Sequence, residues 1–181
     1  MATVFDGIDS SLAEWISRQH VFFVATAPLA NDGHVNCSPK GLPGSFAILN
    51  EHEVAYQDLT GSGAETIAHL RENGRIVIMF CAFEGRPRIV RLHGAGSVID
   101  PSKSDFADLQ QYFDHYAGVR SIIKIAVERV SDSCGYGVPK MEFAEERPNL
   151  PLDHEKRGSD GLVAYRREFN AQSLDGLPAL S

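Results

Sequence analysis

The segment Asn36-Cys37-Ser38-Pro39-Lys40-Gly41 groups side chains that could bind an anionic or polar ligand. It places an amide, a hydroxyl and an ammonium close together, beside the flexible backbone of Gly41. These are the donor types that bind a phosphate or a polar heterocycle. Taken alone, the segment is more simply interpreted as the exit of a hairpin with an exposed lysine. A binding role therefore depends on what the rest of the chain contributes.

A second segment, Gln57-Asp58-Leu59-Thr60-Gly61-Ser62, leads through Gly63 into a predicted helix. Backbone N–H groups at a helix N-terminus, with serine and glycine nearby, can bind an anion. The segment lacks both the spacing and the lysine of a P-loop. An ordinary helix start without a ligand is the alternative, and from these residues alone it is the more frequent outcome.

Two arginines, Arg88 and Arg91, stand in a predicted strand. If the strand alternates strictly, Arg86 and Arg88 share one face, whereas Ile89, Arg91 and His93 share the other. Arg91 lies in the middle of an apolar run. It forms either a surface salt bridge or a contact with a dimer interface or a buried anion, and the mid-strand position favours the second interpretation.

Other kinds of chemistry find no support in the sequence. The seven histidines form neither H-x-x-x-H nor H-E-x-x-H, so no catalytic metal is expected. No G-x-S-x-G occurs, which disfavours an esterase nucleophile elbow. The three cysteines, Cys37, Cys81 and Cys134, are odd in number and far apart, which argues against a disulfide framework and a zinc site. Reduced thiols of this kind fit a cytoplasmic protein.

The composition indicates one ordinary globular domain. The chain has 181 residues, 43% of them hydrophobic and 23% charged, with a formal net charge of −7. A surface of that sign repels phosphate backbones, so general nucleic-acid binding is not expected. No apolar run is long enough to span a membrane, and the acidic N-terminal stretch lacks the order of a secretory signal. An anionic ligand would need a local positive pocket.

Hydrophobic periodicity and turn residues predict the elements that must position these groups. Helices are expected near residues 9–19, over 64–72, after Pro101 and over 161–170; strands are expected over 21–26, 34–38, 46–49, 54–57, 75–83, 88–99 and 122–130, with a tight hairpin at Asn31-Asp32-Gly33 and a loop over 39–44. Because strands and helices do not alternate, a doubly wound parallel sheet is disfavoured. The six or seven strands predict a mainly β (α+β) protein, a small closed antiparallel barrel with helices outside.

The order of these segments resembles the pyridoxamine 5′-phosphate oxidase-like family of FMN-binding split barrels. The matching residues are Phe22 to Thr26, Asn36-x-Ser38-Pro39-Lys40-Gly41, Tyr56-x-Asp58-x-x-Gly61, the helix ending at Asn73, and Arg88-x-Val90-x-x-x-Gly94. The tail is similar to a subgroup of oxidases of undefined substrate, through Cys134-Gly135-Tyr136-Gly137-Val138-Pro139 and Ser173-Leu174-Asp175-Gly176-Leu177-Pro178. The resemblance covers nearly the whole chain.

The resemblance implies a fold, a cofactor and a partner. The fold would be a split six-stranded antiparallel barrel over residues 1–140, with a tail over 141–181 whose helix packs on the barrel or on the dimer partner. The partner would be a second copy of the chain, with an FMN at each of two sites on the subunit interface. One side of each flavin would be lined by Asn36, Cys37, Ser38, Pro39, Lys40, Gly41, Gln57, Asp58, Leu59, Thr60, Gly61 and Ser62, and the strand from Arg88 to Gly94 would approach from the interface.

The cations expected around the FMN phosphate are few. In the family several arginines and lysines usually hold that group, but the segment after Gly61 reads Ser-Gly-Ala-Glu. Lys40, Arg88 and Arg91 are then the residues left to neutralise it. The tail also lacks the basic substrate motif of true pyridoxamine-phosphate oxidases, so the resemblance does not carry the vitamin B6 reaction to this chain.

The leading hypothesis is an FMN-dependent oxidoreductase of unknown substrate, in which the flavin performs the redox chemistry and no side chain is assigned as acid or base. One alternative is a protein without catalytic activity that binds flavin or haem on the same barrel, with His93 or His69 as the haem ligand. Another is a deazaflavin-dependent reductase on a related barrel. The cofactor that the protein binds would separate the three.

Overall fold

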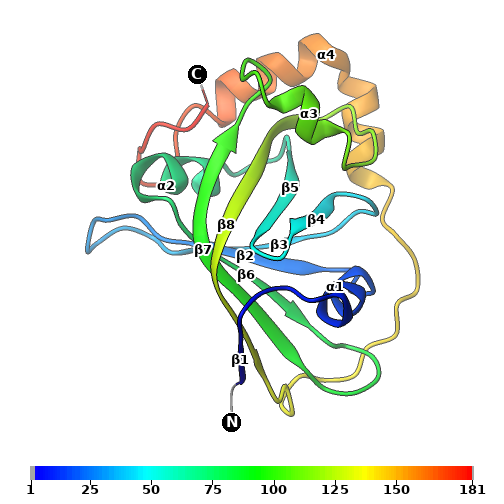
Figure 1. Cartoon of the computed structure of the whole chain (residues 1–181). Coiled ribbons are helices and arrows are strands. Elements are labelled where there is room, and N and C mark those ends of the chain that lie inside the picture. The colour runs from blue at the N-terminus through cyan, green and yellow to red at the C-terminus, as the bar shows by residue number, and fades with distance from the viewer. Residues whose placement is uncertain (1–2, 181) are drawn as a thin grey trace.

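The computed structural model describes residues 3–180, which form one curved antiparallel sheet with helices around it (Figure 1). The strands are β1 Thr3–Phe5, β2 Phe22–Thr26, β3 Asn36–Lys40, β4 Phe46–Asn50, β5 Glu53–Leu59, β6 Arg75–Cys81, β7 Ile89–Ile99 and β8 Val119–Ser133; the helices are α1 Ser10–Ser17, α2 Glu65–Asn73, α3 Phe106–Gln110 and α4 Asn149–Phe169. The expected mainly β fold with flanking helices is confirmed.

The sheet follows the order β3-β2-β6-β7-β8-β5-β4, with β1 paired to β8 outside this path. It therefore has eight strands rather than six, and within residues 3–180 its two end strands, β3 and β4, do not pair. The closed barrel that the strand pattern alone predicted was therefore wrong, whereas the open sheet agrees with the split barrel that the resemblance implied. The chain between the end strands holds Leu42 and Gly44 at φ values of 83° and 63°, and this irregular turn separates β3 from β4 instead of joining them as a hairpin.

The core lies between the sheet and the helices α1 and α2. Val24, Ile78 and Leu92 stand in register across β2, β6 and β7, and all three are fully buried. Phe22 packs near the rings of Phe46, Tyr56 and Phe80 at centroid distances of 5.0, 5.5 and 5.8 Å. Offset and edge-on aromatic packing of this kind stabilises a core beyond its buried area.

The β2–β3 connection differs from the tight hairpin expected at Asp32-Gly33. β2 ends at Thr26 and β3 begins at Asn36, because the His34 backbone N–H donates to Asp175 in the tail instead of to a neighbouring strand. At the far end, Pro39 and Lys40 belong to β3 rather than to a loop. The proline is tolerated because β3 pairs only with β2, so no second strand needs its missing N–H.

The last helix is the largest difference from the sequence-based expectation. α4 begins at Asn149 instead of 161 and passes through a kink at Gly158, whose φ is 63°. Pro151 and Gly158 look like helix breakers in the sequence, but Pro151 lies in the first turn, where a missing N–H costs little. α3 is shorter than its apolar stripe suggested, and Tyr112 beyond it is exposed.

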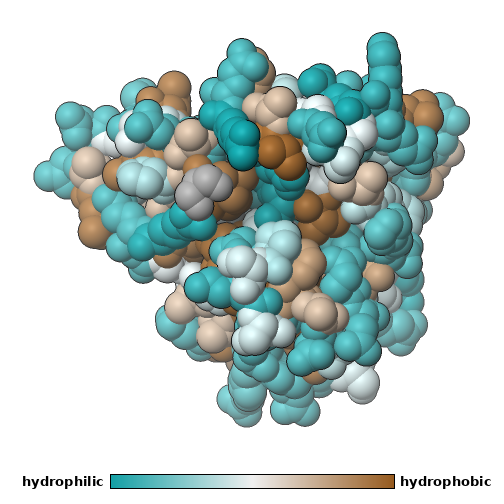
Figure 2. Space-filling view, turned by 90° about the horizontal axis from the view of Figure 1, so that it is seen from above, coloured by the Kyte–Doolittle hydropathy of each residue, from teal (hydrophilic) through white to brown (hydrophobic). Residues whose placement is uncertain are grey.

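α3 and α4 lie together at one end of the sheet, whereas the long segment that follows β8 runs along one side of the molecule (Figure 1). Seen from the end that carries these two helices, the surface is mostly hydrophilic, with hydrophobic side chains scattered between (Figure 2). Among residues 3–180, no helix combines the length and the apolar character needed to cross a bilayer.

Candidate functional site

A cavity of about 1190 Å³ lies at the ends of β3 and β5. The C-terminal end of α1 and the turn after β6 form further parts of its wall. The outer wall is an extended segment, residues 134–148, here called the strap, together with the first turn of α4. Seven of the site residues predicted from the sequence line this cavity: Pro39, Lys40, Gly41, Gln57, Leu59, Thr60 and Gly61.

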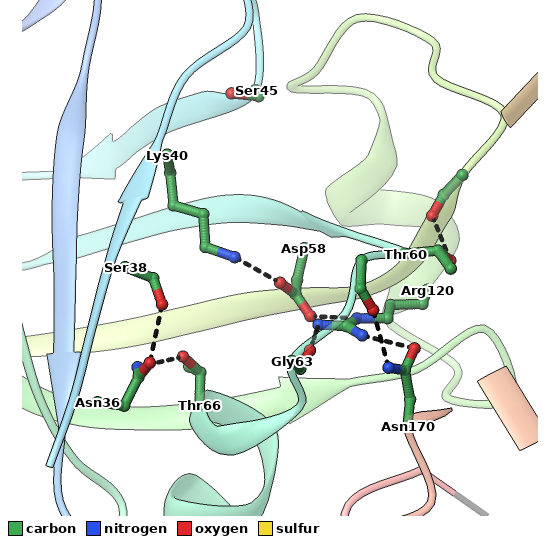
Figure 3. A network of polar contacts seen from close by, with 12 residues as sticks. Asn36, Ser38, Lys40, Ser45, Asp58, Thr60, Gly63, Thr66, Arg120 and Asn170 are labelled. Carbon is green, nitrogen blue, oxygen red and sulfur yellow. Dashed lines mark hydrogen bonds and ion pairs between the residues drawn. The ribbon is translucent and has the colours of Figure 1, made fainter. Parts of the chain in front are cut away.

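Lys40 and Asp58 meet at the inner wall of this cavity (Figure 3). The Lys40 Nζ lies 3.0 Å from Asp58 Oδ1, and the Lys40 side chain keeps 25% of its surface exposed, against 1% for Asp58. On its other side, Asp58 Oδ2 accepts from Arg120 Nε at 2.7 Å. The carboxylate is thus held between two cations, and only the lysine reaches the cavity.

The ionisation of Asp58 follows from these contacts. Burial on its own would raise the pKa of the carboxyl. The charges of Lys40 and Arg120, and the hydrogen bonds that both donate, outweigh burial and hold the pKa below its usual value. Asp58 is therefore ionised at neutral pH, and it fixes the ammonium of Lys40 in place.

Arg120 connects this ion pair to the tail of the chain. Its Nη1 donates to Asn170 Oδ1 at 2.8 Å and its Nη2 to the carbonyl of Gly63 at 2.7 Å. Asn170, at the C-terminal end of α4, donates from Nδ2 to the carbonyl of Gly61 at 2.8 Å. The carbonyls of the Gly61–Gly63 turn are thus held by a strand residue and a tail residue (Figure 3).

The tail makes a second contact with the cavity wall through His154. This buried histidine of α4 donates from Nε2 to the carbonyl of Thr60 at 2.8 Å. It fits because residue 118 is a glycine: a Cβ there would lie 1.8 Å from His154 Nδ1. The position of Thr60 therefore depends on a helix far along the chain.

The side chains of Asn36 and Ser38 belong to a different hydrogen-bond network, which lies beneath α2. Ser38 Oγ donates to Asn36 Oδ1 at 2.8 Å, and Asn36 Nδ2 donates to Thr66 Oγ1 at 3.1 Å. The same network includes Thr26, whose Oγ1 lies 2.9 Å from His69 Nδ1. These side chains hold β3 against α2 and lie outside the cavity lining.

His69 is fully buried in this network, which makes it inaccessible to a haem. Burial lowers the pKa of its imidazole, although nearby acidic residues oppose the shift. His93 is exposed on β7. Of the two haem ligands considered from the sequence, only His93 has an accessible ring.

The arginines of the sequence prediction lie apart from the cavity. Arg88 pairs with Asp132 at 3.0 Å and stacks over the rings of Phe5 and Trp15, and Arg91 Nη1 donates to Ser133. Neither lines the cavity, whereas Arg86, in the turn before β7, does. The alternation argument placed Arg86 and Arg88 on one face, but the strand begins only at Ile89, so the argument applies to neither of them.

The remaining predicted residues occupy separate environments. Cys37 and Ser62 are exposed and, like Asp58, lie outside the cavity lining. Near Ser62, α2 has Ala64 as its N-cap and no side-chain cap, and Glu65 in its first turn accepts a hydrogen bond from the Leu174 N–H.

Sequence reasoning missed Arg120, His154, Asn170 and the strap. Each of these comes from a segment far in sequence from Lys40 and Asp58, and no local sequence pattern indicates that it belongs to the site.

Three comparisons place this geometry among known proteins. Residues 8–134 match the family model of pyridoxamine 5′-phosphate oxidase. A pyridoxamine 5′-phosphate oxidase family protein of Aspergillus flavus, ustO, is 40% identical over 196 residues, which cover 99% of this chain and 78% of that protein.

Solved structures share the fold at lower identity. A HupZ variant of Group A Streptococcus has a TM-score of 0.55 and 23% identity, covering 70% of this chain and 99% of that one. The FAD binding protein from Mycobacterium smegmatis has a TM-score of 0.50 and 10% identity, covering 72% of this chain and 96% of that one. The match over the sheet, together with the fungal relative that spans nearly the whole chain, shows that this protein belongs to the pyridoxamine 5′-phosphate oxidase family.

Proposed function

We propose that the protein binds FMN in the cavity between β3, β5 and the strap, and that it is a flavin-dependent oxidoreductase. The observation that carries the proposal is the buried Gln57 on the cavity wall. Its Nε2 donates to the carbonyl of Asp114 at 3.0 Å, whereas its Oε1 has no partner among the described residues. A buried acceptor without a donor is costly, and a rotation of the Gln57 side chain toward the adjoining cavity would let a ligand N–H remove that cost.

The lining residues fit the parts of a flavin. The oxidised ring system is planar, largely apolar and carries one ring N–H donor, which matches apolar neighbours such as Val21 and Leu59 beside Gln57. Lys40 has three N–H donors and uses one on Asp58, so it can still bind an anionic group. Arg86 lines the same cavity and has no ion pair among residues 3–180.

These residues bind and orient the cofactor. Lys40 and Arg86 would hold the phosphate. The strap would exclude water from the outer side of the cavity. When bound, a flavin supplies hydride or electron transfer, and the chain supplies position and electrostatics. The Mycobacterium smegmatis protein indicates that this fold can hold a flavin.

We also infer a cytoplasmic homodimer. All three cysteines are free thiols, as a reducing compartment requires. On β7, Arg91 is half-buried and His93 exposed, so this strand offers a polar face to a partner. An obligate dimer should bury more than about 2,000 Å² in total. Sedimentation of a stable monomer at micromolar concentration would exclude it.

The test of the proposed function is the absorbance spectrum and mass of the small molecule that co-purifies with the protein. The proposal predicts the two absorption bands of oxidised flavin and the mass of FMN, followed by bleaching when a reduced nicotinamide is added. A Soret band would identify a haem protein instead, and a deazaflavin mass would identify the related reductase. A colourless protein that takes up no FMN on reconstitution would contradict the proposal.

A further inference from the structure

The outer half of the cavity has its own chemistry, distinct from that of the inner wall. Pockets that hold one drug-sized ligand commonly measure about 300–1,000 Å³. This cavity, at about 1190 Å³, exceeds that range. If FMN occupies the inner wall as proposed above, space remains between the flavin and the strap for a second molecule.

An aromatic ring on the strap offers a stacking surface to that molecule. Phe143 stacks on His20 with ring centroids 3.7 Å apart and planes inclined by 7°. Both residues line the cavity, and Phe143 remains 43% exposed. Met141, also on the strap and 54% exposed, adds a flexible apolar surface nearby.

The segment that carries Phe143 is fixed by its backbone. The Met141 N–H donates to the carbonyl of Phe83 at 3.0 Å, and the Phe143 N–H donates to Glu84 Oε1 at 2.9 Å. Both acceptors belong to the turn after β6, which is itself part of the cavity wall. The ring of Phe143 is therefore held in position before any ligand arrives, which lowers the entropic cost of stacking.

Charge on the cavity lining is predominantly negative, and Glu142, Glu145 and Glu146, with the cation Arg147, belong to the strap. Two of the lining cations are already paired, Arg18 with Glu14 and Lys40 with Asp58. Among residues 3–180, the lining side chains without an ion pair are the cations Arg86 and Arg147 and the anions Glu84, Glu142, Glu145 and Glu146. A cation that binds the FMN phosphate is neutralised by it, so the remaining charge of the cavity lining becomes still more negative.

We infer that the space between Phe143 and the strap glutamates is a substrate subsite for planar aromatic molecules that are neutral or cationic. The inference rests on the proposed function for the position of the flavin. Stacking on Phe143 selects a flat ring, and the excess of glutamates repels anions and attracts amines. A phosphorylated substrate, such as the one that gives the family its name, is therefore disfavoured at this subsite.

Two probes that share one ring and differ in charge test the subsite. Tryptamine is cationic at neutral pH, whereas indole-3-acetate is anionic. Calorimetric titration at low salt, with and without FMN, should show that tryptamine binds at least about tenfold more tightly than indole-3-acetate. The ratio should shrink as salt is added, because salt screens exposed charges.

Variants separate the two parts of the subsite. Combined replacement Glu142→Gln, Glu145→Gln and Glu146→Gln should reduce the ratio to within about threefold, because only charge changes. Glu128→Gln, Glu155→Gln and Glu168→Gln together form the matched control, since these exposed acids lie outside the cavity lining. Phe143→Ala should weaken both probes roughly three- to tenfold and leave their ratio unchanged. Phe169→Ala is its control, an exposed ring outside the lining.

The outcomes distinguish this inference from the proposed function. Equal binding of the two probes, tighter binding of indole-3-acetate, or a ratio that the three strap replacements leave unchanged would overturn the subsite, even if FMN binds normally. Discrimination between the probes by a protein that binds no FMN would support the subsite and remove the proposed function.

Discussion

The ammonium of Lys40 lies 3.0 Å from the carboxylate of Asp58, yet only Lys40 lines the cavity. The aspartate is almost completely buried, and Arg120 holds its other oxygen. This arrangement positions a cation at the cavity wall through an anion beneath it. It also means that the charge of Lys40 is partly neutralised before a phosphate arrives, so a second cation is needed.

Removing the buried anion should destabilise the fold. Asp58→Asn leaves Arg120 buried without its counter-charge, and loss of one partner of a buried pair typically costs about 3–5 kcal/mol. Glu53→Gln is the matched control, because its pair with Lys124 is about one-third exposed on each side and should contribute less than about 1 kcal/mol. Urea unfolding measures both. If both variants lose a similarly small part of their free energy of unfolding, another group must compensate the charge of Arg120 when Asp58 is neutral.

Acid should destabilise the protein through the same carboxylate. Because the pKa of Asp58 is lower in the folded state than its ordinary value of 3.8, the unfolded chain binds this proton more readily. The stabilisation is complete above the ordinary pKa and is lost as pH falls through the folded one. The free energy of unfolding should fall more steeply from about pH 5 to pH 3 in wild type than in Asp58→Asn. Parallel curves would assign the acid sensitivity to other groups.

A methyl group at position 118 should disturb the cavity wall from behind. In Gly118→Ala the new Cβ would overlap His154 Nδ1, so the histidine must move and release the carbonyl of Thr60. The expected cost is about 1–3 kcal/mol, as for other overpacked sites. Gly137→Ala is the control, because a Cβ there meets nothing within 4 Å and its φ is not positive. Thermal unfolding of the two variants tests this, and equal midpoints would contradict it.

The phosphate of FMN should depend on Lys40 and Arg86. Loss of one charge-assisted contact costs about 1.5–3 kcal/mol, so Lys40→Ala and Arg86→Ala should each weaken FMN binding roughly ten- to a hundredfold. Lys103→Ala, on the exposed turn before α3, should have no effect. Riboflavin, which lacks the phosphate, should bind all four proteins about equally. If Arg88→Ala weakens FMN binding and Arg86→Ala does not, the phosphate is held by Arg88, as the sequence predicted, and not by Arg86.

The sequence predicts the elements better than it predicts the site. Most strands and α2 follow from local apolar patterns and turn residues, so they lie close to where the sequence placed them. The segments with Lys40 and Gln57 do line one cavity, because the sheet curves until β3, at one end of the strand order, approaches β5 near the other end. By contrast, the contacts of Arg120, His154 and Asn170 join residues about 50 or more positions apart, such as Arg120 with Asn170. Nothing local in the sequence encodes those pairings.

The central claim is that FMN binds in this cavity. The most direct test is to titrate FMN into flavin-free protein, to monitor binding by the quenching of flavin fluorescence, and to include a variant whose cavity is blocked. Gly41 lines the cavity without a positive φ, and a Cβ there meets only the carbonyl of His20, at 3.2 Å, so the backbone must yield by a few tenths of an ångström to accept Gly41→Trp, whose indole would then compete with the flavin. Wild type and Gly137→Trp should bind one FMN per chain, and Gly41→Trp should bind at least about tenfold more weakly. A folded wild type that shows no saturable quenching, or a Gly41→Trp protein that binds FMN as wild type does, would contradict the account.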